Sequence, residues 1–280
     1  MTIEQLAVWR EHSEQWSRVG APLRPSLQDG ELLLKMLAVV FAGKPASCEV
    51  AVLGVTPELV QLDWPVGTRL QAFDCSEGMI GAVWRSNPRI RACARLARWQ
   101  DLPVPTGQFD AVVGDGSLNA LPAFAEYHAV MREIWRVTRP EGRVVLRCFL
   151  RPDKAETIQG LKQDLHAGLI GGFHVFKWRL AMLLAAQAQG VVPVNAILEL
   201  FEREFEREEL VRLTGWPRSD VDTIDAYRAK PTAYTFPTLR QLCEVCADGW
   251  ILDRIETADY ELGECCPTLR FTRRADWFVE

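Results

Sequence analysis

The sequence lacks any long apolar run and any excess of basic residues. No stretch of about 18 apolar residues occurs in its 280 residues, so we expect no membrane span. Its 32 Lys and Arg are outnumbered by 37 Asp and Glu, giving a formal net charge of −5. Such a chain has no large electrostatic footprint for nucleic acid. Residues 1–30 are charged and helical in pattern and resemble no secretory signal, so we expect a cytoplasmic protein.

The glycine fingerprint that would hold a pyrophosphate is also missing. The first turn of the expected sheet reads Gly54-Val-Thr-Pro-Glu-Leu59 and has a single glycine. A dinucleotide fold needs several glycines there so that backbone can approach the phosphates. An NAD(P)-dependent oxidoreductase is kept as a second alternative function, and absence of nicotinamide nucleotide binding would end it.

The eight cysteines do not form a disulfide pattern. They are scattered through strand-like and helix-like segments, which favours reduced thiols. Cys243 and Cys246 have a zinc-type spacing, and Cys265 and Cys266 follow, but residues 239–246 read as an amphipathic helix. We therefore interpret these cysteines as core residues and predict no metal site.

Strand-like and helix-like segments alternate along much of the chain. Strands are expected at 49–53, 69–73, 94–99, 109–113 and 143–149, with helix-length segments between them. This alternation predicts parallel strands with right-handed crossovers. Two later strands, 250–256 and 268–273, should form an antiparallel hairpin at the sheet edge. The fold class is therefore α/β, a doubly wound, mostly parallel seven-stranded sheet.

Two helical parts are expected outside this sheet. Residues 1–43 form an N-terminal helical cover of two helices, the first capped by Thr2-Ile-Glu-Gln5 and the second opened by Ser26-Leu-Gln-Asp29. They either form a lid or merely cover a sheet edge. Residues 153–230 form a helical insertion over the substrate, without strands, in which one helix runs from Asn195 through Leu213. The remaining domain comprises residues 44–152 and 231–280.

An acid closes the second expected strand. Asp74 follows Phe73 about 20 residues after the strand end at Leu53 and Gly54, the arrangement that grips ribose hydroxyls of an adenosine cofactor. A strand-end aspartate in isolation is also a common helix N-cap. The strand order around it favours the ribose interpretation.

Taken with Cys75-Ser-Glu-Gly-Met79, Gln100-Asp-Leu102, Gly107-Gln-Phe-Asp-Ala-Val-Val113 and Gly114-Asp-Gly-Ser117, these residues make the chain resemble a class I S-adenosylmethionine-dependent methyltransferase. The resemblance implies S-adenosylmethionine as cofactor, with Asp74 on the ribose, Met79 on the adenine face, and Asp101 and Leu102 on the adenine edge. It places the segment 115–117 at the methionyl end, although Asp115 could equally cap the next helix. The implied cofactor-binding residues are Gly54, Val55, Thr56, Glu58, Asp74, Cys75, Met79, Asp101, Leu102, Asp115, Gly116 and Ser117.

The chain departs from the family pattern at its first turn. Val52 stands where the family has an acid, and the residues after Gly54 are not glycines. The Thr56 hydroxyl and the Glu58 carboxylate are the candidates to take over contacts with the cofactor, Glu58 with its amino group.

The expected function is methyl transfer from S-adenosylmethionine to a small molecule or a polar side chain. Proximity and alignment carry much of such a reaction, so no catalytic residue is assigned. On the substrate side the candidates are His174, Trp178 and Tyr234, for which packing in a core is the competing interpretation. The degenerate turn supports an alternative, a catalytically inactive partner or regulatory subunit of the same fold. A protein partner or a homodimer stays open.

Overall fold

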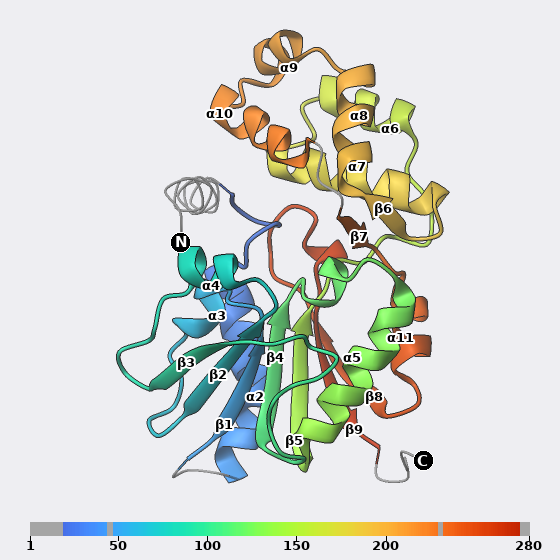
Figure 1. Ribbon diagram of the computed structural model, residues 1–280. Helices are drawn as coiled ribbons and strands as arrows, with labels where there is room; N and C mark the ends of the chain where they lie inside the picture. The colour runs from blue at the N-terminus through green and yellow to red at the C-terminus, as the bar shows by residue number, and fades with distance from the viewer. Residues whose placement is uncertain (1–18, 44–46, 229–231, 275–280) are drawn as a thin grey trace.

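The computed structural model describes residues 19–43, 47–228 and 232–274, and it has a seven-stranded sheet in the order β3-β2-β1-β4-β5-β9-β8 (Figure 1). A second sheet pairs two short strands, β6 and β7. The strands are β1 Glu49–Leu53, β2 Arg69–Asp74, β3 Arg91–Leu96, β4 Phe109–Asp115, β5 Thr138–Arg147, β6 Val191–Pro193, β7 Ala233–Thr235, β8 Trp250–Glu256 and β9 Thr268–Arg273.

Helices occupy the segments between these strands. The α-helices are α2 Leu27–Gly43, α3 Pro57–Val60, α4 Glu77–Val83, α5 Phe124–Val137, α6 Ile158–His166, α7 Phe173–Gln187, α8 Val194–Glu204, α9 Arg207–Thr214, α10 Arg218–Val221 and α11 Leu239–Cys246. Three short 3-10 helices are described as well: η1 Leu118–Ala120, η2 Asp222–Tyr227 and η3 Gly263–Cys265.

The predicted fold class is confirmed. Strands β1 to β5 pair in parallel, and β9 lies antiparallel between β5 and β8. A dinucleotide-binding sheet with the order 3-2-1-4-5-6 has no antiparallel strand at this place. The edge hairpin β8–β9 begins and ends at the residues that the sequence predicted.

Both faces of the large sheet are buried, so its central strands are apolar on both sides. Val50 and Val52 of β1 point to a core shared with α2, α3 and α4, whereas Ala51 and Leu53 point to a core shared with α5 and α11. The α2 helix starts as predicted, because Asp29 accepts hydrogen bonds from both the backbone N–H and the hydroxyl of Ser26. The other predicted N-terminal helix lies outside the described residues.

A helical layer stands above the carboxyl ends of the parallel strands (Figure 1). It contains α6 to α10 with η2, and it has its own core of interlocking aromatic rings, among them Phe173, Phe176 and Phe201. The small sheet β6–β7 lies where this layer meets the large sheet. The expectation of a strandless segment was therefore wrong at residues 191–193, because these residues pair with β7 on the other side of the insertion.

Other predicted element boundaries differ too, among them that of the fifth strand, which covers residues 138–147 instead of 143–149. The expected helix from Asn195 to Leu213 is broken into α8 and α9 at Phe205, whose backbone is extended and whose ring packs 4.9 Å from that of Phe176. Strand β3 covers residues 91–96 instead of 94–99. It is an edge strand whose side chains are largely exposed, so its apolar residues do not mark its ends.

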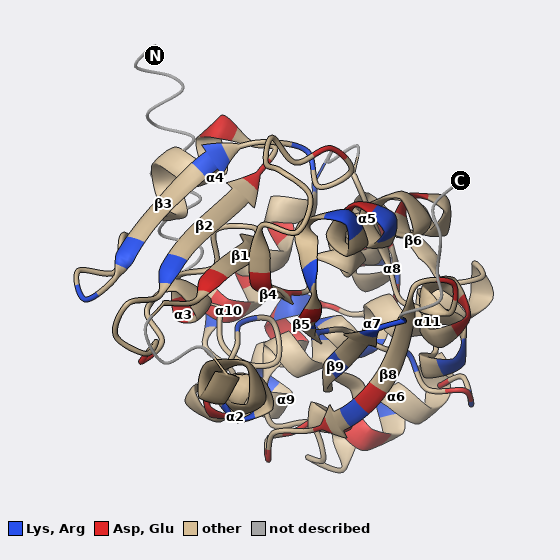
Figure 2. Ribbon diagram, turned by 90° about the horizontal axis from the view of Figure 1, so that it is seen from below, with Lys and Arg blue, Asp and Glu red and all other residues tan. Residues whose placement is uncertain are grey.

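Charged residues are distributed without a region of one sign. Basic and acidic segments are interspersed over the sheet and the helical layer (Figure 2). Among the described residues, no helix is both long and apolar enough to cross a membrane.

Candidate active site

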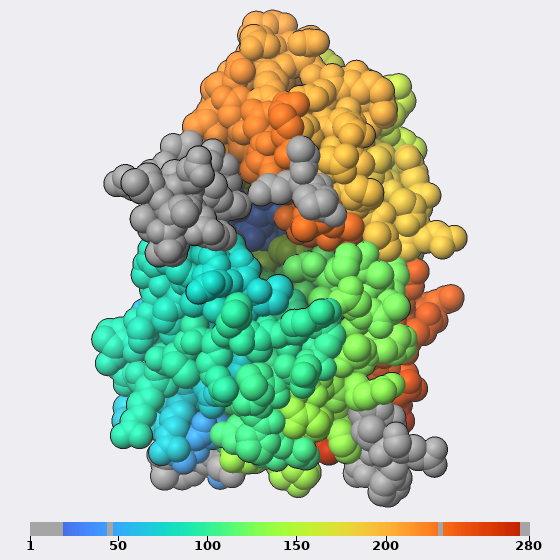
Figure 3. Space-filling view, in the orientation of Figure 1, coloured from blue at the N-terminus to red at the C-terminus, as the bar shows by residue number. Residues whose placement is uncertain are grey.

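A cavity of about 610 Å³ lies between the large sheet and the helical layer. Figure 3 shows the surface hollowed between these two parts. Its floor comes from the ends of β4 and β5 and the start of α4, and its roof comes from α7, η2 and β7. Ligands of open α/β sheets bind outside the carboxyl ends of the strands, and this cavity has that position and a typical volume of about 300–1,000 Å³.

The turn after β1 is open to a ligand. Gly54 has a φ of +98°, a conformation that glycine adopts without steric cost, and the backbone beyond β1 turns there toward α3. A Cβ at this position would meet only the Trp99 ring, at 3.9 Å. The Trp99 indole donates to the Phe73 carbonyl at 2.7 Å, so an aromatic ring lies beside the turn and beside the strand end that carries Asp74.

Asp74 ends β2 and is half-buried. Its Oδ1 accepts a hydrogen bond from the Ser76 backbone N–H at 2.8 Å, and no other donor to the carboxylate is found among the described residues. The N-cap of α4 is Ser76, whose hydroxyl accepts from the Met79 N–H, so the capping interpretation of Asp74 does not hold. Burial raises the pKa of Asp74 above its ordinary value, and the Ser76 hydrogen bond opposes that rise.

Asp74 itself is not on the wall of the cavity, but its neighbours Ser76 and Met79 are. Cys75, which lies between Asp74 and Ser76, is exposed. Asp74 is therefore two residues before Ser76, the N-cap of α4 that lines the cavity.

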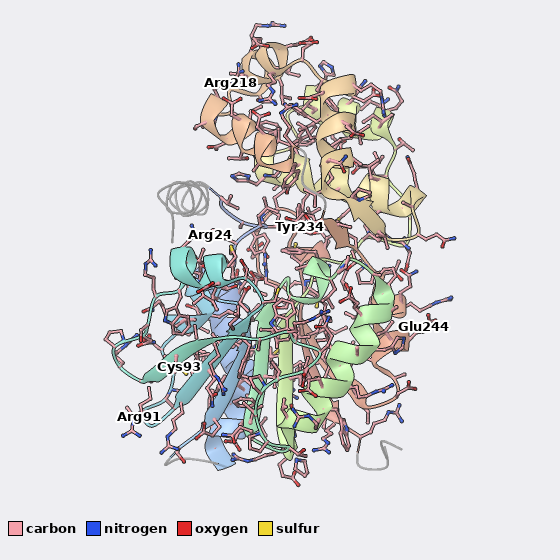
Figure 4. The ribbon with its side chains drawn as sticks, in the orientation of Figure 1. Arg24, Arg91, Cys93, Arg218, Tyr234 and Glu244 are labelled. Atoms are coloured by element: carbon pink, nitrogen blue, oxygen red, sulfur yellow. The ribbon has the colours of Figure 1, made fainter. Side chains whose placement is uncertain are left out.

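Glu58 lies in the first turn of α3. Its Oε1 accepts from the Arg24 guanidinium, with Nε at 2.9 Å, and its Oε2 is buried with no hydrogen-bond partner among the described residues. Figure 4 shows Arg24 above α3 and α4, on the side of the cavity. Thr56 is buried and its side chain does not cap α3, and Val55 is packed in the core.

Asp115 ends β4, lines the cavity and is held by a buried arginine. Arg147 donates to Asp115 at 2.5 Å, and it also contacts Asp29 of α2 at 3.3 Å and the Tyr260 hydroxyl at 2.8 Å. Burial raises the pKa of Asp115, and the guanidinium of Arg147 opposes that rise. Asp115 does not cap η1, so that alternative is excluded.

Gly116 and Asn119 shape the floor beside Asp115. Gly116 has a φ of +59°, and a Cβ there would lie 2.7 Å from the Phe149 ring. The Asn119 amide donates to the carbonyls of Phe149 and Thr235, both at 2.7 Å, which ties β5 to β7 beneath the helical layer. Ser117 is buried and donates to the Leu53 carbonyl, away from the cavity wall.

Asp101 and Leu102, the residues predicted to contact the adenine edge, lie outside the cavity wall. Asp101 is exposed and forms a bridge with Arg98. The Leu102 backbone N–H donates to Glu133 at 2.6 Å, and the Leu102 carbonyl accepts from Arg136. Neither residue lines the cavity, and the backbone of Leu102 has no hydrogen left for a ligand.

The predicted substrate-side residues divide into two groups. Trp178 and Tyr234 line the cavity, with ring centroids 5.7 Å apart, and Tyr234 lies between the sheet and the helical layer in Figure 4. His174 is buried in the first turn of α7 and does not line it. Burial raises the pKa of Tyr234, whose hydroxyl shares a hydrogen bond with that of Tyr227.

Sequence reasoning missed Lys177, which also lines the cavity. It is 2% exposed and sits in the largely apolar helix α7, with Thr223 and Tyr227 of η2 opposite. Burial lowers its pKa to about 7. The sequence carried a partial signal, because residues 173–184 are mostly apolar and aromatic and Lys177 stands among them with His174 and Arg179.

The described residues contain no group of three or more His, Cys, Asp or Glu placed to hold a metal ion. Cys246 belongs to the core between the sheet and α5, whereas Cys265 and Cys266 belong to the core of the helical layer.

A family model described as a methyltransferase domain matches residues 53–146, the segment from the end of β1 to the end of β5. The sheet that contains this segment has the strand order and the antiparallel β9 described above. The chain has the class I S-adenosylmethionine-dependent methyltransferase fold.

Solved structures with related folds share little sequence with this methyltransferase-fold chain. A Rhodobacter sphaeroides protein provisionally described as a zinc-dependent alcohol dehydrogenase has a TM-score of 0.54 at 16% identity, covering 94% of this chain and 98% of that one. An S-adenosylmethionine-dependent methyltransferase from Methanosarcina mazei has a TM-score of 0.47 at 14% identity, with coverage of 84% and 96%. The 1,6-didemethyltoxoflavin-N1-methyltransferase of Burkholderia thailandensis, with 1,6-didemethyltoxoflavin and S-adenosylhomocysteine bound, has a TM-score of 0.49 at 12% identity, with coverage of 98% and 86%. No curated protein matches the sequence.

Of the residues predicted for the site, five line the cavity of this methyltransferase-fold chain: Met79, Asp115, Gly116, Trp178 and Tyr234. The others surround it or lie apart from it.

Proposed function

We propose that this protein transfers a methyl group from S-adenosylmethionine to a small-molecule acceptor. The observation that carries the proposal is the cavity at the carboxyl ends of β4 and β5. It begins at Ser76 and Met79, which follow the strand-end acid Asp74 in the sequence, and ends under the aromatic residues of the helical layer. A cofactor held at the sheet would there meet an acceptor held by α7 and β7.

The residues around the sheet suit this cofactor. The Asp74 carboxylate has one oxygen that receives no donor from the described residues, and vicinal ribose hydroxyls would supply charge-assisted hydrogen bonds. The buried Oε2 of Glu58, which has no partner in the described part of the chain, suits the cationic amino group of the methionyl end. Met79 offers an apolar contact for adenine at the start of α4.

S-adenosylmethionine supplies a methyl group that is already activated for transfer. The protein's part is then to align the two molecules and to exclude water. The aromatic side chains of Trp178 and Tyr234 in the roof and Phe149 beside the floor would exclude water. Domain boundaries follow the same division: residues 44–152 and 231–280 would bind the cofactor, and residues 153–230 would cover the acceptor.

Replacing Asp74 with Ala should weaken S-adenosylhomocysteine binding by about one to two orders of magnitude, because about 1.5–3 kcal/mol of charged hydrogen bonding is lost. Isothermal titration calorimetry measures this loss. Asp74→Asn keeps an acceptor for the Ser76 N–H but removes the charge, so it separates cofactor contact from turn geometry.

The matched control is Asp63→Ala, an exposed loop acid paired with Arg89, which should bind the cofactor like the wild type. Equal affinity in wild type and Asp74→Ala would show that Asp74 serves the Ser76 turn and no ligand. Turnover is then tested with a labelled methyl group and a panel of small acceptors.

A further inference from the structure

We propose that the roof of the cavity is a binding site for the negatively charged oxygen of a small aromatic acid, held by Lys177 and Trp178. The inference rests on the proposed function, since it names the chemical class of the acceptor. It starts from two neighbouring residues of α7, one with a single hydrogen-bond acceptor and one with none among the described residues.

The Lys177 ammonium has three hydrogens and little to bind. Among the described residues its Nζ contacts one acceptor, the Thr223 hydroxyl, at 3.3 Å, and no carboxylate pairs with it. Asp220 of α10 acts on it only through space. The rings of Tyr227 and Phe173 lie 5.1 and 5.8 Å from Nζ and supply cation–π attraction, but they accept no conventional hydrogen bond.

The Trp178 indole is the second unused donor. The side chain is 4% exposed and lines the same cavity, and its Nε1 is buried with no hydrogen-bond partner among the described residues. A buried N–H without an acceptor costs about 1–3 kcal/mol. Because Lys177 and Trp178 line the same cavity, a ligand there that offers oxygen acceptors would stabilise both donors.

The other polar groups at this end are already occupied. The hydroxyls of Tyr227 and Tyr234 bind each other, and the Asn119 amide makes three hydrogen bonds to backbone. The buried Trp178 N–H and the Lys177 cation are the polar groups here with the fewest partners among the described residues, which favours an anionic oxygen as ligand.

Shape narrows the ligand further. Trp178 and Phe149 stand edge to face at 4.9 Å, and Tyr234 and Tyr227 continue the aromatic wall toward Lys177. A flat aromatic ring fits such walls with good contact. Because Lys177 is 2% exposed, the charged oxygen must reach an enclosed position, which a small molecule can do and a polymer cannot.

The experiment is calorimetry on the full chain without cofactor, with benzoate, 4-nitrophenolate and neutral benzamide as probes. We expect benzoate or 4-nitrophenolate to bind at least about tenfold more tightly than benzamide, and Lys177→Met to abolish that preference. Binding of benzoate alone would identify a carboxylate, and binding of 4-nitrophenolate alone an acidic hydroxyl. Binding of neither, or equal binding to Lys177→Met, overturns the proposal.

Trp178→Phe keeps the aromatic contact and removes the N–H, so it should lose about threefold or more in benzoate affinity. Lys154→Met, at an exposed lysine, is the matched control and should bind like the wild type. If Lys177→Met fails to fold, NMR of ¹³C-labelled lysine in the wild type replaces it: benzoate should move the resonance that titrates near pH 7 to higher pH. An unmoved titration contradicts the proposal. This experiment contains no cofactor, so its outcome does not depend on cofactor binding, which the S-adenosylhomocysteine titration tests separately.

Discussion

Replacing Lys177 with Met should stabilise the protein at neutral pH and remove one part of its pH-dependent stability. Burial lowers the pKa of this lysine in the folded protein to about 7 from its ordinary 10.5. Between these values the unfolded chain holds the proton and the folded chain has released it. The unfolded state then binds more protons, so stability rises with pH.

The magnitude follows from that difference in pKa. At pH 7 the lowered pKa costs the folded protein about 4 kcal/mol, and at pH 9 about 2 kcal/mol. The lost Thr223 hydrogen bond and cation–π contacts offset about 1–2 kcal/mol of the gain. The unbranched Met side chain fills much of the same volume. We therefore expect Lys177→Met to be more stable than the wild type by about 2–3 kcal/mol at pH 7 and by about 2 kcal/mol less than that at pH 9.

Urea unfolding followed by circular dichroism at pH 7 and pH 9 measures both values. The difference between variants is the quantity to compare, because other groups that titrate in this range are present in both proteins. The exposed lysine variant Lys154→Met should follow the wild type at both pH values. A variant that loses stability at pH 7, or a gap that does not narrow toward pH 9, would refute the argument that Lys177 is buried as a costly cation.

Three further outcomes follow from the site. Gly116→Ala should destabilise the protein by about 1–3 kcal/mol in thermal unfolding, because the new Cβ would lie 2.7 Å from the Phe149 ring and the backbone has a positive φ. The control is Gly81→Ala on α4, which has open space around it and should be neutral or stabilising. Arg147→Met leaves Asp115 without its buried partner and should cost about 3–5 kcal/mol in urea unfolding. Binding of S-adenosylhomocysteine should weaken on acidification through the raised pKa of Asp74, since the carboxylate form is the acceptor, and calorimetry of Asp74→Ala should lack that dependence.

Much of the fold was predictable because the central strands of the sheet have a clear apolar pattern in the sequence. The central strands β1 and β4 are buried on both faces and therefore read as continuous apolar runs. The hairpin β8–β9 was also located correctly. The third strand was displaced because an edge strand with exposed side chains has no apolar signal. The break at Phe205 depends on a ring contact with Phe176, a tertiary contact that helical periodicity does not encode.

The site was predictable where it follows from strand ends and not where it depends on packing. Met79, Asp115 and Gly116 lie on the cavity because the carboxyl ends of parallel strands share one edge. The surroundings of Leu102 could not be predicted, because its backbone N–H donates to Glu133 of α5, a tertiary contact. Lys177 was missed because its importance comes from burial by η2, which lies more than 40 residues away in the sequence.

The degenerate first turn gains a physical explanation from the charges around it. The family pattern has an acid before Gly54, and this chain has Val52 there, fully buried. Asp115 is paired with the buried Arg147. Arg24 binds one oxygen of Glu58, and the other is buried with no partner among the described residues. Under the proposed function, the negative charge that a cationic amino group requires would lie in the first turn of α3 instead of at the end of β1, with Arg24 orienting the carboxylate.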